Sequence, residues 1–240
     1  MNAEKRKGVM LMKKVARVFA VFVFVLAFSV FPSNSASAQT GFYVGVFGGY
    51  AFSPDASLSY TYYDYYYYYN REYDVEVQDS AVFGFKFGYT PPRLKFLSFE
   101  FEYSYLNPDV DRTALPYDPS SFAIAEGDIE LNNFMFNAIF KYPEGKFHPY
   151  IGLGIGFSYI DWSLTTTSPV RSISNDDTVF AWQMLAGVEI DLTNNLSVDI
   201  GYRFFATESS SDDDYYDYYD NDTRLEYRTS MVTLGLKYKF

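Results

Sequence analysis

The stretch LSFEFEYSYL, residues 97–106, decides the fold class of this 240-residue chain. Apolar and polar side chains alternate along it from Leu97 to Tyr105. Because successive side chains of a β-strand point to opposite faces, one face is aromatic and the other carries Ser and Glu. Strands of about ten residues with this alternation are typical of transmembrane β-barrels.

Seven further segments alternate in the same way and, with Phe96–Leu106, make eight. They are Phe42–Phe52, Ala81–Thr90, Asp128–Tyr142, Pro149–Trp162, Thr178–Leu192, Leu196–Ala206 and Arg228–Phe240. One face of each is apolar and aromatic, and the other carries Gly, Ser and charges. A soluble barrel would bury carboxylates such as Glu100 in an apolar interior, which is costly. The sequence therefore predicts an all-β fold, an eight-stranded antiparallel up-and-down transmembrane β-barrel with its apolar face toward lipid.

The connections between these segments alternate in length, as in outer-membrane barrels. The short ones are Pro91–Lys95, Pro143–His148 and Thr193–Asn195, which we expect on the periplasmic side. The long ones are Ser53–Ser80, Asn107–Gly127, Leu164–Asp177 and Glu208–Tyr227, which we expect outside the cell. The long loops hold 20 of the 30 acidic residues and 4 of the 19 basic ones. The net charge of −11 disfavours a nucleic-acid partner.

Residues 1–38 have the pattern of a cleavable signal peptide. Lys13, Lys14 and Arg17 precede the apolar run Val18–Phe31, and Ala36-Ser37-Ala38 forms a small-x-small cleavage site. The alternative is a membrane anchor, but the apolar run is short for one. We therefore expect a signal peptide at 1–38 and a barrel domain at 39–240.

Charged residues of both signs fall on the face predicted to line the lumen. They are Lys86, Lys141, Arg203, Lys237 and Lys239, against Glu100, Glu102, Glu189 and Asp199. An eight-stranded interior is only wide enough for side chains, so we expect these groups to pair and plug the barrel. The alternative is a narrow channel for small solutes or ions. The row Gly152, Gly154, Gly156 leaves room on one wall of the barrel. We expect large side chains of neighbouring strands to fill this room, with a small cavity as the alternative.

Two predicted loops are rich in tyrosine and aspartate. The first contains Tyr65, Tyr66, Tyr67, Tyr68 and Tyr69; the second contains Tyr215, Tyr216, Tyr218 and Tyr219 among Asp212, Asp213, Asp214, Asp217, Asp220 and Asp222. Tyrosine favours strands, so the loops could form hairpins that turn near Asn70-Arg71 and Asp220-Asn221. They could contact an extracellular protein or glycan, hold Ca²⁺ that bridges to lipopolysaccharide, or form a variable solvated surface.

Catalysis finds little support in the sequence. There is no Cys, and the single histidine, His148, falls in a predicted periplasmic turn. Glu100 and Glu102 lie two apart on one strand face, which ion pairing in the interior explains equally well. We therefore expect no enzymatic activity and no cofactor.

The C-terminal residues resemble the β-signal of outer-membrane proteins, through Thr233-x-Gly235-x-x-Tyr238-x-Phe240. The pattern of residues 41–240 resembles the small eight-stranded barrels of the OmpA-like and OmpX-like group within the porin superfamily. The resemblance implies insertion by the barrel-assembly machinery into a Gram-negative outer membrane, among its lipid and lipopolysaccharide. It also implies that surface loops carry the function, so we expect a structural or surface-contact role, with a narrow channel as the alternative.

Overall fold

The computed structural model describes residues 40–64, 67–118, 121–167, 170–208 and 222–240. The predicted signal peptide at 1–38 lies outside these residues. The strands are β1 (Gly41–Asp64), β2 (Tyr67–Val75), β3 (Ser80–Thr90), β4 (Leu97–Leu106), β5 (Asp109–Asp118), β6 (Ser121–Lys141), β7 (Phe147–Thr167), β8 (Val170–Asp191), β9 (Leu196–Glu208) and β10 (Asp222–Lys239).

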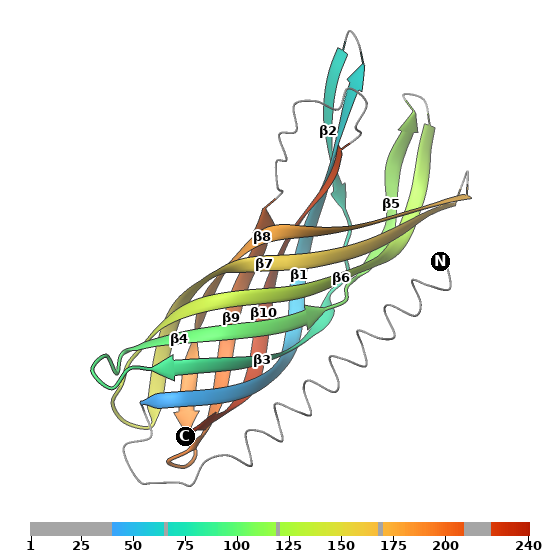
Figure 1. Ribbon diagram of the computed structural model, residues 1–240. Coiled ribbons are helices and arrows are strands. Elements are labelled where there is room, and N and C mark those ends of the chain that lie inside the picture. Colours follow the sequence, from blue (N-terminus) through green and yellow to red (C-terminus); the bar gives the residue numbers. More distant parts are fainter. Residues whose placement is uncertain (1–39, 65–66, 119–120, 168–169, 209–221) are drawn as a thin grey trace, which may run out of the picture. The chain divides into compact units, whose positions relative to one another are not determined.

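Eight of these strands close into an antiparallel barrel. Their order is β10-β9-β8-β7-β6-β4-β3-β1, and pairing of β1 with β10 joins the two ends of the sheet. The other two strands extend hairpins from one end, with β2 paired to β1 and β5 paired to β6 (Figure 1). The predicted eight-stranded up-and-down barrel is confirmed. We call the end with these extensions the hairpin end and the end with the short connections the turn end.

Several strands are longer than predicted and take in much of the predicted loops. β1 has 24 residues and β8 has 22, whereas a tilted strand crosses a bilayer in about 9–11. The predicted turn at Asn70-Arg71 is wrong, because both residues pair with β1 inside the hairpin, Asn70 with Thr61 and Arg71 with Tyr60. The predicted turn at Asp220-Asn221 is not placed, since Asp220 lies outside the described residues and Asn221 is likewise not described.

The outward face of the barrel is apolar and exposed, as expected for contact with lipid. Its exposed side chains include Phe83, Phe136, Ile151, Leu153, Ile155 and Leu234, each more than half exposed. On β7 and β8 the outward positions become polar toward the hairpin end, where Asp161 pairs with Asp176. No helix among the described residues is long and apolar enough to cross a membrane.

The interior has two parts of opposite character. Toward the turn end it is filled with charged and polar side chains, and toward the hairpin end with apolar ones. The sequence-based expectation of Gly, Ser and charges along the whole inner face is therefore wrong for the hairpin half. There, inward positions such as Leu106 and Phe205 are apolar too, because strand segments that rise above the lipid can fill their interior as a soluble protein does.

Candidate functional site

An ion pair crosses the middle of the lumen. Arg203 on β9 contacts Glu102 on β4, although these strands are not neighbours in the sheet. Glu102 also accepts hydrogen bonds from Gln183 Nε2 at 3.3 Å and Asn137 Nδ2 at 3.4 Å. The guanidinium carbon of Arg203 lies 4.1 Å from the centroid of the Phe47 ring. Side chains from five strands thus meet at one level and occupy the lumen.

Further charged groups pair between this level and the turn end. Lys237 Nζ donates to Glu189 Oε2 at 2.7 Å, and Lys239 Nζ lies 2.6 Å from the other oxygen of the same carboxylate. Lys86 Nζ is 3.5 Å from Asp199 Oδ1. All nine charged residues predicted to line the lumen are buried, and we call seven of them the charged layer: Lys86, Glu100, Glu102, Glu189, Asp199, Arg203 and Lys237.

Two tyrosines donate hydrogen bonds to carboxylates of the charged layer. Tyr43 Oη donates to Glu100 at 3.0 Å, and Tyr150 Oη donates to Asp199 at 3.1 Å. Sequence reasoning missed both tyrosines. Both lie near the turn end of the barrel, at positions whose side chains point inward. The two-residue alternation of their strands, which also places Gly and Lys on the inner face, was the signal that could have found them.

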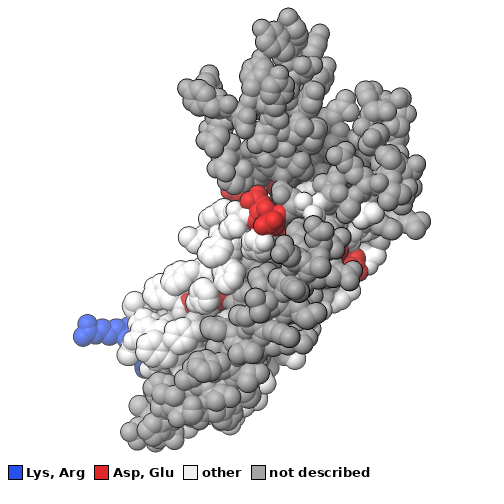
Figure 2. Space-filling view, turned by 45° about the vertical axis from the view of Figure 1, so that its right-hand side comes forward, with Lys and Arg blue, Asp and Glu red and all other residues white. Residues whose placement is uncertain are grey.

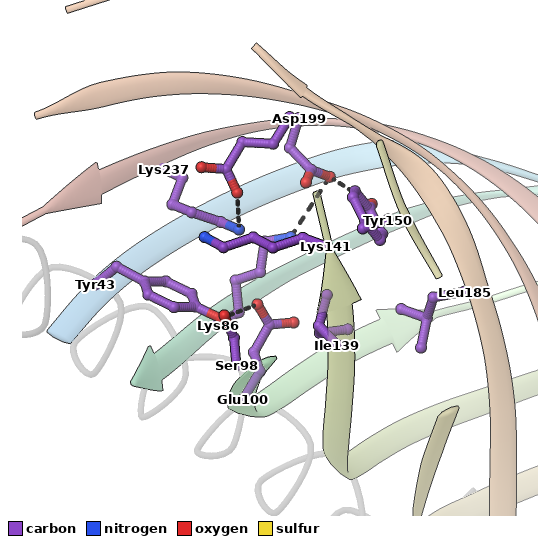
Figure 3. Close-up of a pocket in the computed structure, with 11 residues that line it drawn as sticks. Tyr43, Lys86, Ser98, Glu100, Ile139, Lys141, Tyr150, Leu185, Asp199 and Lys237 are labelled. Atoms are coloured by element: carbon purple, nitrogen blue, oxygen red, sulfur yellow. Dashed lines mark hydrogen bonds and ion pairs between the residues drawn. The ribbon is translucent and has the colours of Figure 1, made fainter. Parts of the chain in front are cut away.

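A small cavity lies within the charged layer (Figure 3). Its free volume of ≈ 10 Å³ is about enough for one water molecule. Lys141 lines it and is buried, yet it forms no ion pair within 4.0 Å among the described residues. The cavity lies toward the turn end, and none of Gly152, Gly154 and Gly156, where the sequence left a small cavity as the alternative, lines it.

Apolar side chains close the lumen a second time, toward the hairpin end. We call this cluster the apolar layer: Phe47, Ala51, Ala56, Val82, Leu106, Val110, Ile129, Leu131, Met135, Ile160, Trp162, Val179, Ala181, Phe205, Tyr227 and Met231. Leu106, Leu131 and Tyr227 are fully buried. The sequence signal was the loss of alternation, as at Val179-Phe180-Ala181-Trp182, where both faces are apolar.

The glycine row on β7 is covered by neighbouring side chains and backbone. A Cβ at Gly154 would lie 2.0 Å from Asn137 Oδ1, and one at Gly152 would lie 2.6 Å from Ile139 Cδ1. A Cβ at Gly156 would lie 2.0 Å from the carbonyl oxygen of Phe134. Neighbouring atoms therefore occupy the space that a side chain would need at these glycines, and no room is left along this part of the wall.

The sequence placed His148 in a periplasmic turn, and that prediction is wrong. It is the second residue of β7 and is buried, with Nδ1 2.9 Å from the carbonyl oxygen of Tyr142 and Nε2 2.9 Å from Asp191 Oδ2. β7 begins at Phe147, two residues earlier than predicted, and its parity turns His148 inward. The residue joins three strand ends at the turn end.

The tyrosine and aspartate candidates lie mostly beyond what the structure describes. Tyr67, Tyr68 and Tyr69 belong to β2, and Asp222 begins β10, each placed by its backbone alone. The rest lie outside the described residues: Tyr65, Tyr66, Tyr215, Tyr216, Tyr218, Tyr219, Asp212, Asp213, Asp214, Asp217 and Asp220. Across the side chains that are described, no three His, Asp or Glu residues form a group suited to a metal ion.

The residues of the C-terminal motif divide between the two faces of β10. Thr233 and Gly235 point inward, and Thr233 Oγ1 donates to the carbonyl oxygen of Gly201 at 3.4 Å. Tyr238 is exposed on the outward face, and Phe240 follows the end of the strand. The motif thus coincides with the strand that closes the barrel against β1.

A family profile matches nearly the whole chain. The profile described as "Outer membrane protein beta-barrel domain" matches residues 20–240. An uncharacterized protein of Brucella abortus (strain 2308) is 35% identical over 79 residues, which are 29% of this chain and 28% of the relative. The match thus spans well under a third of the relative's length.

Solved outer-membrane proteins are similar to this chain at low sequence identity. The outer membrane protein OprG of Pseudomonas aeruginosa matches with a TM-score of 0.52 and 15% identity over 84% of this chain and 96% of OprG. Neisserial surface protein A matches at 0.47 and 18% over 84% and 98% of the two chains. The outer membrane protease OmpT of Escherichia coli matches at 0.47 and 8% over 87% and 99%. The likeness to OprG shows the fold alone.

Proposed function

The chain belongs to the outer membrane protein β-barrel family, and on that premise we propose that it acts at the cell surface through its hairpin end, not through its lumen. The protein resides in the bacterial outer membrane with its long loops outside, so the hairpin end is extracellular and the turn end periplasmic. The proposed role is contact with an extracellular protein or glycan. We propose no catalytic step.

The double closure of the lumen carries this proposal. A solute would have to part the Arg203–Glu102 pair and then the apolar layer. Parting a buried ion pair leaves both charges uncompensated in the interior, which is costly. Apolar packing above it removes the hydrated path that an ion needs. Both features support a barrel that serves as a rigid support for its extracellular strands.

The chemistry of the extracellular segments supports a contact role. Tyr67–Val75 and its partner strand in β1 carry most of the first tyrosine-rich segment, and tyrosine offers large amphipathic contact area at low cost in side-chain entropy. Pairing with β1 would pre-organise this surface. A narrow channel remains the second candidate function, favoured by the cavity and by Lys141, which lines it and forms no ion pair with any described residue.

Planar-bilayer recording of the purified protein tests the proposal against the channel. We expect no conductance steps from protein whose folded state is verified by its altered mobility on an unheated gel. Stable steps that change in Arg203→Ala would favour the channel. Binding of cells that display the protein to immobilised matrix proteins and glycans then tests the contact role, with Tyr65–Tyr69 changed to Ser. Equal binding by both forms would count against this tyrosine segment.

A further inference from the structure

Two adjacent periplasmic turns form a surface of unusual composition. One is the β3–β4 turn with Arg93, Leu94, Lys95 and Phe96, and the other is the β6–β7 turn with Lys146. The backbone N–H of Lys141 donates to the carbonyl of Phe96 at 2.8 Å, so the two turns lie side by side. We call Arg93, Lys95 and Lys146, with their apolar neighbours Leu94, Phe96 and Phe147, the basic turn patch.

The shape of the patch is fixed by its backbone. Leu94 N–H donates to the carbonyl of Pro91 at 3.0 Å, and Leu97 N–H donates to the carbonyl of Leu94 at 2.9 Å. The turn therefore holds Arg93 and Lys95 on either side of Leu94 without a long flexible loop. All three basic side chains are exposed, and blue side chains protrude at this end of the molecule in Figure 2.

The basic groups of the patch are not neutralised by the protein. Within the described part of the chain, Arg93, Lys95 and Lys146 form no ion pair within 4.0 Å. The one acid in these turns, Glu144, accepts a hydrogen bond from Tyr142 Oη at 3.2 Å, and its charge raises the pKa of that phenol. The third periplasmic turn, Thr193–Asn195, carries no charge. The positive charge is thus confined to one side of the barrel.

Apolar groups of the patch continue directly into the lipid-facing surface. Leu94 is 41% exposed, Phe96 48% and Phe147 63%. Side chains of this kind insert among acyl chains, while Lys and Arg keep their charged ends at the headgroups. An anionic lipid matches both parts of the patch, because its headgroup carries negative charge and its acyl chains are apolar. A soluble anion would satisfy the charges alone.

We propose that the basic turn patch binds anionic glycerophospholipids of the periplasmic leaflet of the outer membrane. Each Lys or Arg close to an anionic membrane surface contributes on the order of a fivefold preference at its own site. The preference lies on the side of the barrel formed by β3, β4, β6 and β7. It is independent of the extracellular contact role.

Spin-labelled lipids test this inference on the protein purified from outer membranes and reconstituted in phosphatidylcholine vesicles. The measured quantity is the ratio of the association constants of labelled phosphatidylglycerol and phosphatidylcholine at the protein surface. We expect an average preference of about twofold for the anionic lipid, because a site-specific preference is diluted over all boundary lipids. The triple change Arg93→Gln, Lys95→Gln, Lys146→Gln should bring the ratio close to one.

Two controls separate this site from a general effect of charge. Glu144→Gln removes the acid beside the patch and should raise the ratio, whereas Arg228→Gln at the extracellular end should leave it unchanged. Should the triple variant fail to fold, salt gives the same test on the unaltered protein, since about 1 M salt shortens the screening length to about 3 Å. A ratio near one in the unaltered protein, or one insensitive to both salt and the triple change, overturns the proposal and leaves an acidic protein surface as the partner.

Discussion

Arg203 on β9 and Glu102 on β4 pair across the lumen, between strands on opposite walls of the barrel. Both side chains are at most 2% exposed. Their contact joins walls that the hydrogen bonds of the sheet connect only indirectly. The pair is therefore a cross-brace as well as a barrier.

Removing the carboxylate charge of this pair should destabilise the barrel strongly. Glu102→Gln leaves the buried Arg203 guanidinium without its paired carboxylate, so we expect a loss of about 3–5 kcal/mol in the free energy of unfolding. The measurement is urea unfolding of the protein refolded in lipid. Glu100→Gln is the matched control, because Glu100 accepts from Tyr43 and Asn137 and should lose about 1 kcal/mol. Equal losses in the two variants would contradict the cross-brace.

The apolar layer should keep the lumen closed even without Arg203. Arg203→Ala opens the charged layer but leaves Leu106, Leu131 and Phe205 packed toward the hairpin end. We expect single-channel recordings of Arg203→Ala to show no stable conductance. Conductance should require a second change, such as Phe205→Ala combined with Arg203→Ala. Steps from Arg203→Ala alone would show that the apolar layer is not a barrier.

Gly154→Ala and Gly48→Ala should differ in their effect on the free energy of unfolding. At Gly154 the new methyl carbon would overlap Asn137 and come within 2.9 Å of Gln183, so we expect a loss of about 1–3 kcal/mol in the free energy of unfolding. At Gly48 its nearest neighbour would be Phe83 at 3.4 Å, an ordinary contact. Gly48→Ala should therefore be close to neutral in the same urea titration. Similar stabilities for the two variants would mean that the Gly154 wall is loosely packed.

His148 should stabilise the periplasmic end through its two ring nitrogens. His148→Ala removes the links to the Tyr142 carbonyl and the Asp191 carboxylate, two part-buried hydrogen bonds, at a cost of about 1–3 kcal/mol. Hydrogen exchange of the amides near the β6–β7 and β8–β9 turns should accelerate more than exchange elsewhere. Lys146→Ala, an exposed change in the neighbouring turn, should alter stability by less than about 0.5 kcal/mol. Uniform exchange changes in His148→Ala would argue against a local role.

The inner face shows where sequence reasoning succeeded and where it failed. Parity alone placed Lys86, Glu102 and Arg203 in the lumen, because a period of two leaves each side chain a single face. Parity could not say which cation meets which carboxylate. That depends on how far each strand is staggered as the barrel closes, and the stagger brings β4 and β9 to the same height. Parity also places Tyr43 and Tyr150 on the inner face, but not the carboxylates that they contact.

The sequence by itself determined the strand faces, the eight-stranded closed barrel and the direction of the apolar surface. These follow from local alternation and from the need to satisfy every backbone hydrogen bond in lipid. Only the tertiary structure decided that the lumen is closed twice, that Asn70 and Arg71 pair within β2, and that His148 is buried. Each of these depends on register and on contacts between residues far apart in the chain. The alternation of apolar and polar residues determines neither the register nor these contacts, since it fixes only the face on which a side chain lies and not its neighbours across the barrel.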